Sequence, residues 1–191
     1  MKNLVVKPSK IVTRGTAIHD VEKLNIYYQK FIFGKKVPPI SIVSPNLYPI
    51  WRFKKDLEVN KLGLKDSDLE IELFDADKFE ESLSYWMNHG AEYLICDGNH
   101  RGVAYALAEL DIPTREVERF SDIKIIIKEL GGSAPLIMHD SNSMKQYMFK
   151  LYRGLSKNTL YTLEGKVRQL QNYNELKLEK GAIVYNPDTP F

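Results

Sequence analysis

The chain of 191 residues contains a single cysteine, Cys96. A disulfide within the chain is therefore excluded, and so is a zinc site built from several thiolates. No stretch approaches the roughly 18 consecutive apolar residues that cross a bilayer. The apolar run near the start is also too short for a signal peptide. These absences predict a cytoplasmic protein without a membrane partner.

The chain also lacks a strong charge bias, an internal repeat and a low-complexity tract. Its 27 Lys and Arg residues against 25 Asp and Glu give a formal net charge of +2. This value neither indicates nor excludes a nucleic-acid partner, because a basic patch can lie on a nearly neutral chain. The hydrophobic fraction of 43% and the charged fraction of 27% are ordinary for a globular protein. The length suits one domain, or a domain with a small appendage.

Apolar periodicity predicts alternating helices and strands over much of the chain. Helices are expected over about 20–34, 77–90, 100–110, 121–130 and 144–152, and strands over about 37–43, 91–96 and 112–120. The expected N-caps are Asp20, Asp77 and Ser121. The strand, turn, helix and strand over 91–120 indicate an α/β (α+β) fold.

Other segments have less decisive patterns. Aromatic and basic residues alternate over 51–55, which predicts a half-buried strand. The same residues could instead stack on single-stranded nucleic acid. Acidic residues alternate with apolar ones over 66–73, which predicts a strand with a solvated acidic face. Residues 163–170 fit either a helix or a hairpin, and 176–185 a terminal hairpin.

The strongest local signal lies where the apolar segment 94–96 meets Asp97-Gly98-Asn99-His100-Arg101. A buried strand there runs through a glycine turn directly into a helix. The first amides of a helix have no partners within the helix, and the helix dipole adds partial positive charge. Such ends bind anions. His100 and Arg101 would add donors, while Asp97 would support the turn or position a ligand hydroxyl or a metal.

The same turn also has a purely structural interpretation. Asp-Gly and Gly-Asn are common turn dipeptides, and Asn99 could simply cap the following helix. His100 and Arg101 could be ordinary surface residues. The spacing by itself leaves both interpretations open.

The run Asp97-Gly98-Asn99-His100-Arg101, followed by an alanine-rich helix and Ile112-Pro113, resembles the signature of the ParB/sulfiredoxin superfamily. That family has a D-G-x-H-R or G-E-R-R turn between a strand and a helix. It also has a P-I-x-V strand, which Pro39-Ile40-Ser41-Ile42-Val43 resembles. The resemblance covers roughly residues 8–120, with about 44–90 as an insertion.

This resemblance implies a ParB/sulfiredoxin-like mixed sheet flanked by helices over 1–120. Residues 121–191 would form a helical segment and a C-terminal extension packed on it. The resemblance also implies that the turn binds the phosphates of ATP, ADP or CTP. The residues expected to contact phosphate are Gly98, Asn99, His100 and Arg101, with Arg14 reaching across the cleft.

The branches of the family differ in chemistry. Sulfiredoxins need a nucleophilic cysteine immediately before the His-Arg pair, and Asn99 at that position cannot form a thiolate. The branch similar to free-serine kinases transfers phosphate to a small hydroxyl-bearing metabolite, usually with Mg²⁺. Its carboxylate lies early in the chain, where this sequence offers Asp20 and Glu22. No motif secures that alignment, and Asp20 is also the expected helix cap.

The sequence therefore predicts a nucleotide-binding protein with phosphotransfer or nucleotide hydrolysis as its chemistry. The candidate catalytic residues are Asp20, Glu22 and Asp97. The alternative is a DNA-associated ParB-like module, either a partitioning-type clamp or a nuclease. The link between the helices expected over 121–152 is longer than the tight turn of a helix-turn-helix. The scattered histidines give no metal-ligand spacing.

Overall fold

A computed structural model describes residues 1–15, 20–58, 76–131, 134–172, 176–179 and 181–185. Its strands are β1 (Lys2–Val6), β2 (Ile11–Arg14), β3 (Ile40–Val43), β4 (Tyr93–Asp97), β5 (Ile112–Glu116), β6 (Leu160–Thr162), β7 (Leu176–Glu179) and β8 (Ala182–Tyr185). Its α-helices are α1 (Val21–Ile32), α2 (Ile50–Glu58), α3 (Ala76–Asn88), α4 (Asn99–Leu107), α5 (Phe120–Leu130), α6 (Leu136–His139), α7 (Met144–Ser156) and α8 (Leu163–Asn172). Short 3₁₀ turns cover Pro8–Lys10 and Pro45–Leu47.

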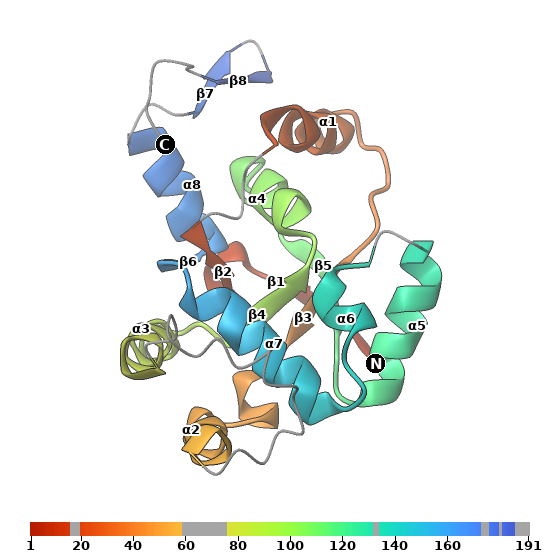
Figure 1. The fold of residues 1–191 in the computed structure, drawn as a ribbon. Helices are drawn as coiled ribbons and strands as arrows, with labels where there is room; N and C mark the ends of the chain where they lie inside the picture. The colour runs from red at the N-terminus through yellow and green to blue at the C-terminus, as the bar shows by residue number, and fades with distance from the viewer. Residues whose placement is uncertain (16–19, 59–75, 132–133, 173–175, 180, 186–191) are drawn as a thin grey trace.

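The expected α/β fold with a mixed sheet is confirmed. Six strands form one sheet in the order β1-β5-β3-β4-β2-β6, and helices lie on both of its faces (Figure 1). β2 is parallel to β4, and β3 is parallel to β5, whereas the other neighbouring pairs are antiparallel. Because β2 and β4 are parallel neighbours, their carboxyl ends reach the same edge of the sheet.

The side chains of the central strand β4 point alternately into two separate hydrophobic clusters of the core. Leu94 and Cys96 belong to a hydrophobic cluster that includes side chains of α2, α3, α5, α6 and α7. Ile95, between them, belongs to a second cluster with α1, α4 and α8. Successive side chains of a strand point to opposite faces, so a single strand joins both layers. In Figure 1, α1 and α4 accordingly lie on the opposite side of the sheet from α2, α3 and α7.

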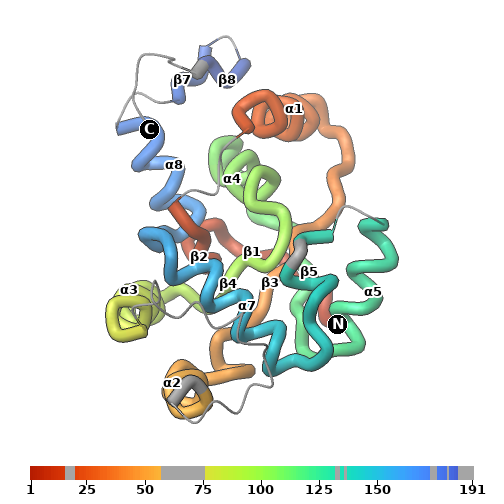
Figure 2. Tube along the Cα trace, in the orientation of Figure 1, coloured from red at the N-terminus to blue at the C-terminus, as the bar shows by residue number. Residues whose placement is uncertain are grey.

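Residues 121–191 are built into this architecture in three places. Strand β6 pairs with β2 at the edge of the main sheet. Helix α8 packs beside α4, and the hairpin β7–β8 lies beside α1 (Figure 2). The Ile183 amide donates to Asn25 Oδ1 at 3.2 Å, which joins the hairpin to α1. The hairpin expected over 176–185 is therefore confirmed, and residues 163–170 are helical.

The strand expected over 51–55 is wrong, because these residues lie in helix α2. The amides of Arg52 and Phe53 both donate to the Pro49 carbonyl, which closes the first helical turn. Phe53 is fully buried and Trp51 is 60% exposed. Five residues with one buried aromatic are too few to distinguish the two-residue period of a strand from the 3.6-residue period of a helix. The strand expected over 66–73 lies outside the described residues.

Two expected N-caps are also wrong. Helix α3 begins at Ala76, so Asp77 lies inside its first turn and pairs with Lys54 Nζ at 2.7 Å. Helix α5 begins at Phe120 with Arg119 as its N-cap, so Ser121 is inside the helix. The buried carboxylate of Asp122 instead accepts from the Arg119 amide. The cap at Asp20 is confirmed, since its side chain accepts from the Lys23 amide at 2.8 Å.

Strands β1 and β2 were not expected from the sequence. β1 is an edge strand whose first residues are mostly exposed, so it lacks a clear apolar alternation. Among the described residues, no helix has the length and apolar character needed to cross a membrane.

Candidate functional site at the end of the central strands

The turn between β4 and α4 depends on Gly98. This residue has a φ of 93° and serves as the N-cap of α4. A Cβ at this position would lie 2.8 Å from Ile40 Cγ2, so both the backbone conformation and the space require glycine. The Gly102 amide donates to the Gly98 carbonyl at 2.8 Å. The amides of residues 99–101 precede this first helical bond and have no carbonyl within the helix to bind.

Arg101 points back into the protein. It is 6% exposed, and its Nη2 lies 2.5 Å from Asp97 Oδ2. Its Nη1 donates to the carbonyls of Pro38 and Pro39, each at 2.9 Å. The guanidinium therefore ties the turn to the chain that enters β3. His100, beside it, is also buried.

A cavity of about 290 Å³ opens next to this turn, and Asp97 and Asn99 form part of its wall. Arg14, at the carboxyl end of β2, lines the same cavity. The parallel pairing of β2 with β4 brings these ends together. The Thr13 hydroxyl donates to Asn99 Oδ1 at 2.8 Å, so this amide side chain joins the end of β2 to the start of α4. The structure thus brings Arg14, Asp97 and Asn99 together at one cavity.

Helix α7 and the chain just before it close the opposite wall. They contribute Lys150, Leu151, Gly154 and Leu155, together with Pro135 and Ile137. None of these residues was singled out from the sequence. Only the packing of α7 across the end of β4 brings them to the turn.

The charged groups of the cavity favour an anionic ligand. Arg14 and Lys150 supply cationic side chains from different elements. Lys150 Nζ donates to the Asp140 carbonyl at 3.0 Å and lies 4.0 Å from the carboxylate of the same residue, which holds the ammonium toward the chain before α7. Asp97 is the one acidic residue among the described lining residues, and Arg101 is paired with it. Phosphate or carboxylate groups would meet two cations and the positive end of a helix dipole there.

Cys96 lines the same cavity but is poorly suited to nucleophilic chemistry. It is 7% exposed, and burial raises the pKa of its thiol to about 12. The nucleophilic form of cysteine is the thiolate, which this environment disfavours at neutral pH. Cys96 therefore acts as a packing residue of the sheet.

Two of the expected catalytic residues lie elsewhere. The carboxylate of Asp20 caps α1, and Glu22 is an exposed residue in the first turn of that helix. Neither is among the described residues that line the cavity. Across the part of the chain that the structure describes, no group of three or more His, Cys, Asp or Glu side chains could hold a metal ion.

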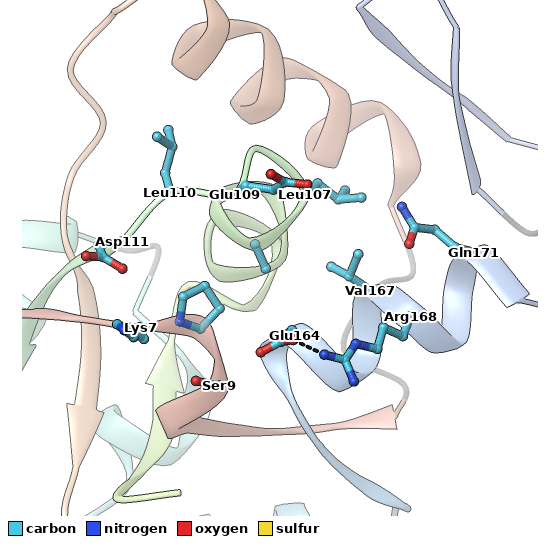
Figure 3. A pocket seen from close by; sticks show the side chains of 12 residues that line it. Lys7, Ser9, Leu107, Glu109, Leu110, Asp111, Glu164, Val167, Arg168 and Gln171 are labelled. Carbon is cyan, nitrogen blue, oxygen red and sulfur yellow. Dashed lines mark hydrogen bonds and ion pairs between the residues drawn. The ribbon is translucent and has the colours of Figure 1, made fainter. Parts of the chain in front are cut away.

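A second cavity, of about 370 Å³, lies at the far end of α4 (Figure 3). Its wall includes Lys7, Glu109 and Asp111, and the ion pair between Glu164 and Arg168 spans part of it. Although larger, it contains none of the turn residues, and most of its charged side chains are exposed. We therefore take the cavity beside the turn as the candidate site.

Comparison of the chain with protein-family models, with curated proteins and with solved structures gives no match. The membership of the ParB/sulfiredoxin superfamily therefore stays a prediction, carried by the turn at 97–101.

Proposed function

We propose that the cavity beside the turn binds the phosphate groups of a nucleotide such as ATP, ADP or CTP. The observation that carries this proposal is the meeting of Arg14 and Lys150 with the N-terminus of α4 around one cavity. Helix N-termini and cationic side chains are a recurring combination in phosphate sites. The volume of about 290 Å³ lies just below the roughly 300–1,000 Å³ range of ligand sites.

The chemistry proposed for this site is phosphotransfer to a small hydroxyl-bearing metabolite, or hydrolysis of the nucleotide. Both reactions depend on positioning the phosphates and neutralising their charge, which Arg14 and Lys150 would do. Mg²⁺ is commonly held by one or two carboxylates together with the phosphates of the substrate. Asp97 is the described lining residue that fits this role.

A thermal-shift panel with ATP, ADP, CTP and GTP in the presence of Mg²⁺ tests the proposal. A nucleotide at about a hundred times its dissociation constant should stabilise the protein by roughly 2.7 kcal/mol. For a chain of this size the melting temperature should rise by roughly 5–10 °C. Arg14→Ala and Lys150→Ala should reduce the shift, whereas Lys7→Ala, which removes a cation from the second cavity, should not. An absence of any shift in the wild type would contradict nucleotide binding.

The rival function is a DNA-associated module, and one surface feature favours it. On α2, the Arg52 guanidinium lies over the ring of Trp51, 5.4 Å from its centre, and both residues are exposed. Exposed aromatic and cationic groups bind single-stranded nucleic acid. In the described part of residues 120–156, helices α5 and α7 are separated by the four-residue helix α6. This connection is longer than the tight turn of a helix-turn-helix, so it does not suit that motif. Salt-dependent DNA binding lost in Trp51→Ala would support the rival.

A further inference from the structure

Helix α7 carries a glycine, Gly154, on the side that faces the cavity. Lys150, Leu151 and Leu155 line the cavity from the same helix, at the spacing of one helical face. Glycine lowers the stability of a helix relative to alanine. The presence of a glycine on this face of α7 therefore needs an explanation.

The usual structural reasons for a glycine do not apply to Gly154. It is not among the described residues with a positive φ, so its backbone accepts any L-residue. It is not the C-cap, because α7 continues to Ser156 and is capped at Lys157. A Cβ at this position would have no heavy atom of the described chain within 4 Å, so close packing does not exclude a side chain. Gly154 lines the cavity, and the space at its Cβ position is open.

The residues beside Gly154 on the cavity-lining face of α7 are mostly apolar. Leu151 and Leu155 flank Gly154 on α7, and Pro135 and Ile137 add further apolar residues to the lining of the same cavity. The Gly154 carbonyl accepts a hydrogen bond from Asn158 Nδ2 at 3.1 Å, so this carbonyl is satisfied at the C-terminal end of the helix. The hydrogen-bonded backbone at Gly154, with open space at its Cβ position, thus leaves room for a planar apolar group to pack.

We infer that Gly154 marks a subsite for the nucleobase of the ligand, whose phosphates lie at Arg14, Lys150 and the N-terminus of α4. This inference rests on the nucleotide-binding function proposed above and deepens it by assigning a second half of the same cavity. The base would pack on α7 between Leu151 and Leu155. An alanine methyl group would fit the protein alone but would occupy space that the base needs.

Binding of two probes to Gly154→Ala tests the inference. ATP and inorganic tripolyphosphate are titrated calorimetrically into wild type and variant. Because the added methyl group would overfill the contact with the base, Gly154→Ala should weaken ATP binding roughly tenfold. The tripolyphosphate, which lacks a base, should bind both proteins within about twofold of each other. Ser156→Ala is the matched control, because it raises the helix propensity of α7 without changing a residue that lines the cavity.

The melting temperature without ligand provides the second measurement. Gly154→Ala should melt no lower than wild type, because the methyl group meets no described atom and alanine favours a helix. Equal ATP binding by Gly154→Ala and wild type would overturn the subsite while leaving nucleotide binding intact. An equal weakening of ATP and tripolyphosphate would also overturn it. If wild type binds neither probe, the nucleotide-binding function itself fails, and the subsite fails with it.

Discussion

Replacing Arg101 by alanine should destabilise the fold whether or not a ligand is present. The Arg101 side chain is 7% exposed, and its guanidinium is held by the Asp97 carboxylate and by the carbonyls of Pro38 and Pro39. Removing one partner of a buried ion pair typically costs about 3–5 kcal/mol, because the other charge stays buried. The Asp97 side chain retains 18% exposure, so we expect the lower end, about 3 kcal/mol. The corresponding fall in melting temperature is roughly 6–12 °C.

Urea unfolding followed by tryptophan fluorescence gives this free energy directly. The double variant Asp97→Ala/Arg101→Ala should be less destabilised than the sum of the two single variants, because the second change removes the unpaired charge. Arg14→Ala is the comparison, since Arg14 lines the cavity and should affect ligand binding more than stability. A change of less than about 1 kcal/mol for Arg101→Ala would refute the structural role of this arginine.

Three further predictions concern other features of the fold. Glu109, at the end of α4, has a φ of 55°, a conformation that glycine adopts more readily than other residues. Glu109→Gly should therefore raise the free energy of unfolding by roughly 0.5–1 kcal/mol, whereas Glu109→Ala should not. Burial opposes ionisation of Asp122, but the backbone amide of Glu118, the Met1 amine and the Arg119 amide lower its pKa below 3.8 overall. This carboxylate therefore contributes stability above about pH 4 that is lost as the pH falls through the lowered pKa. The destabilisation of Asp122→Asn in urea unfolding should accordingly shrink in acid, and a pH-independent difference would contradict it. Burial raises the pKa of Cys96 to about 12, so iodoacetamide at pH 8 should label it only after unfolding.

The region from 91 to 116 was largely predictable from the sequence. Its first apolar run is short and lies between Gly90 and Gly98, so the strand, the turn and the start of the helix follow from local chemistry. Asp20 and Gly34 mark the ends of α1 in the same local way. These features depend on residues close together in the chain, which a sequence pattern records.

The cavity was only partly predictable, because its walls come from distant segments. Asp97 and Asn99 belong to the motif, whereas Lys150 and Gly154 reach it only through the packing of α7. The direction of Arg101 was also hidden, since a sequence does not distinguish a guanidinium turned inward from one turned to a ligand. The tertiary contacts with Pro38 and Pro39 decide it.

The central claim is that a nucleotide binds beside the turn, and a two-dimensional amide NMR titration with ATP and Mg²⁺ tests it most directly. The account predicts saturable shifts of the amides of Asn99, His100 and Gly154, around the cavity of about 290 Å³. The amides of Glu109 and Arg168, which line the second cavity, should stay in place. Shifts confined to the second cavity, or none at all at millimolar ATP, would contradict the account.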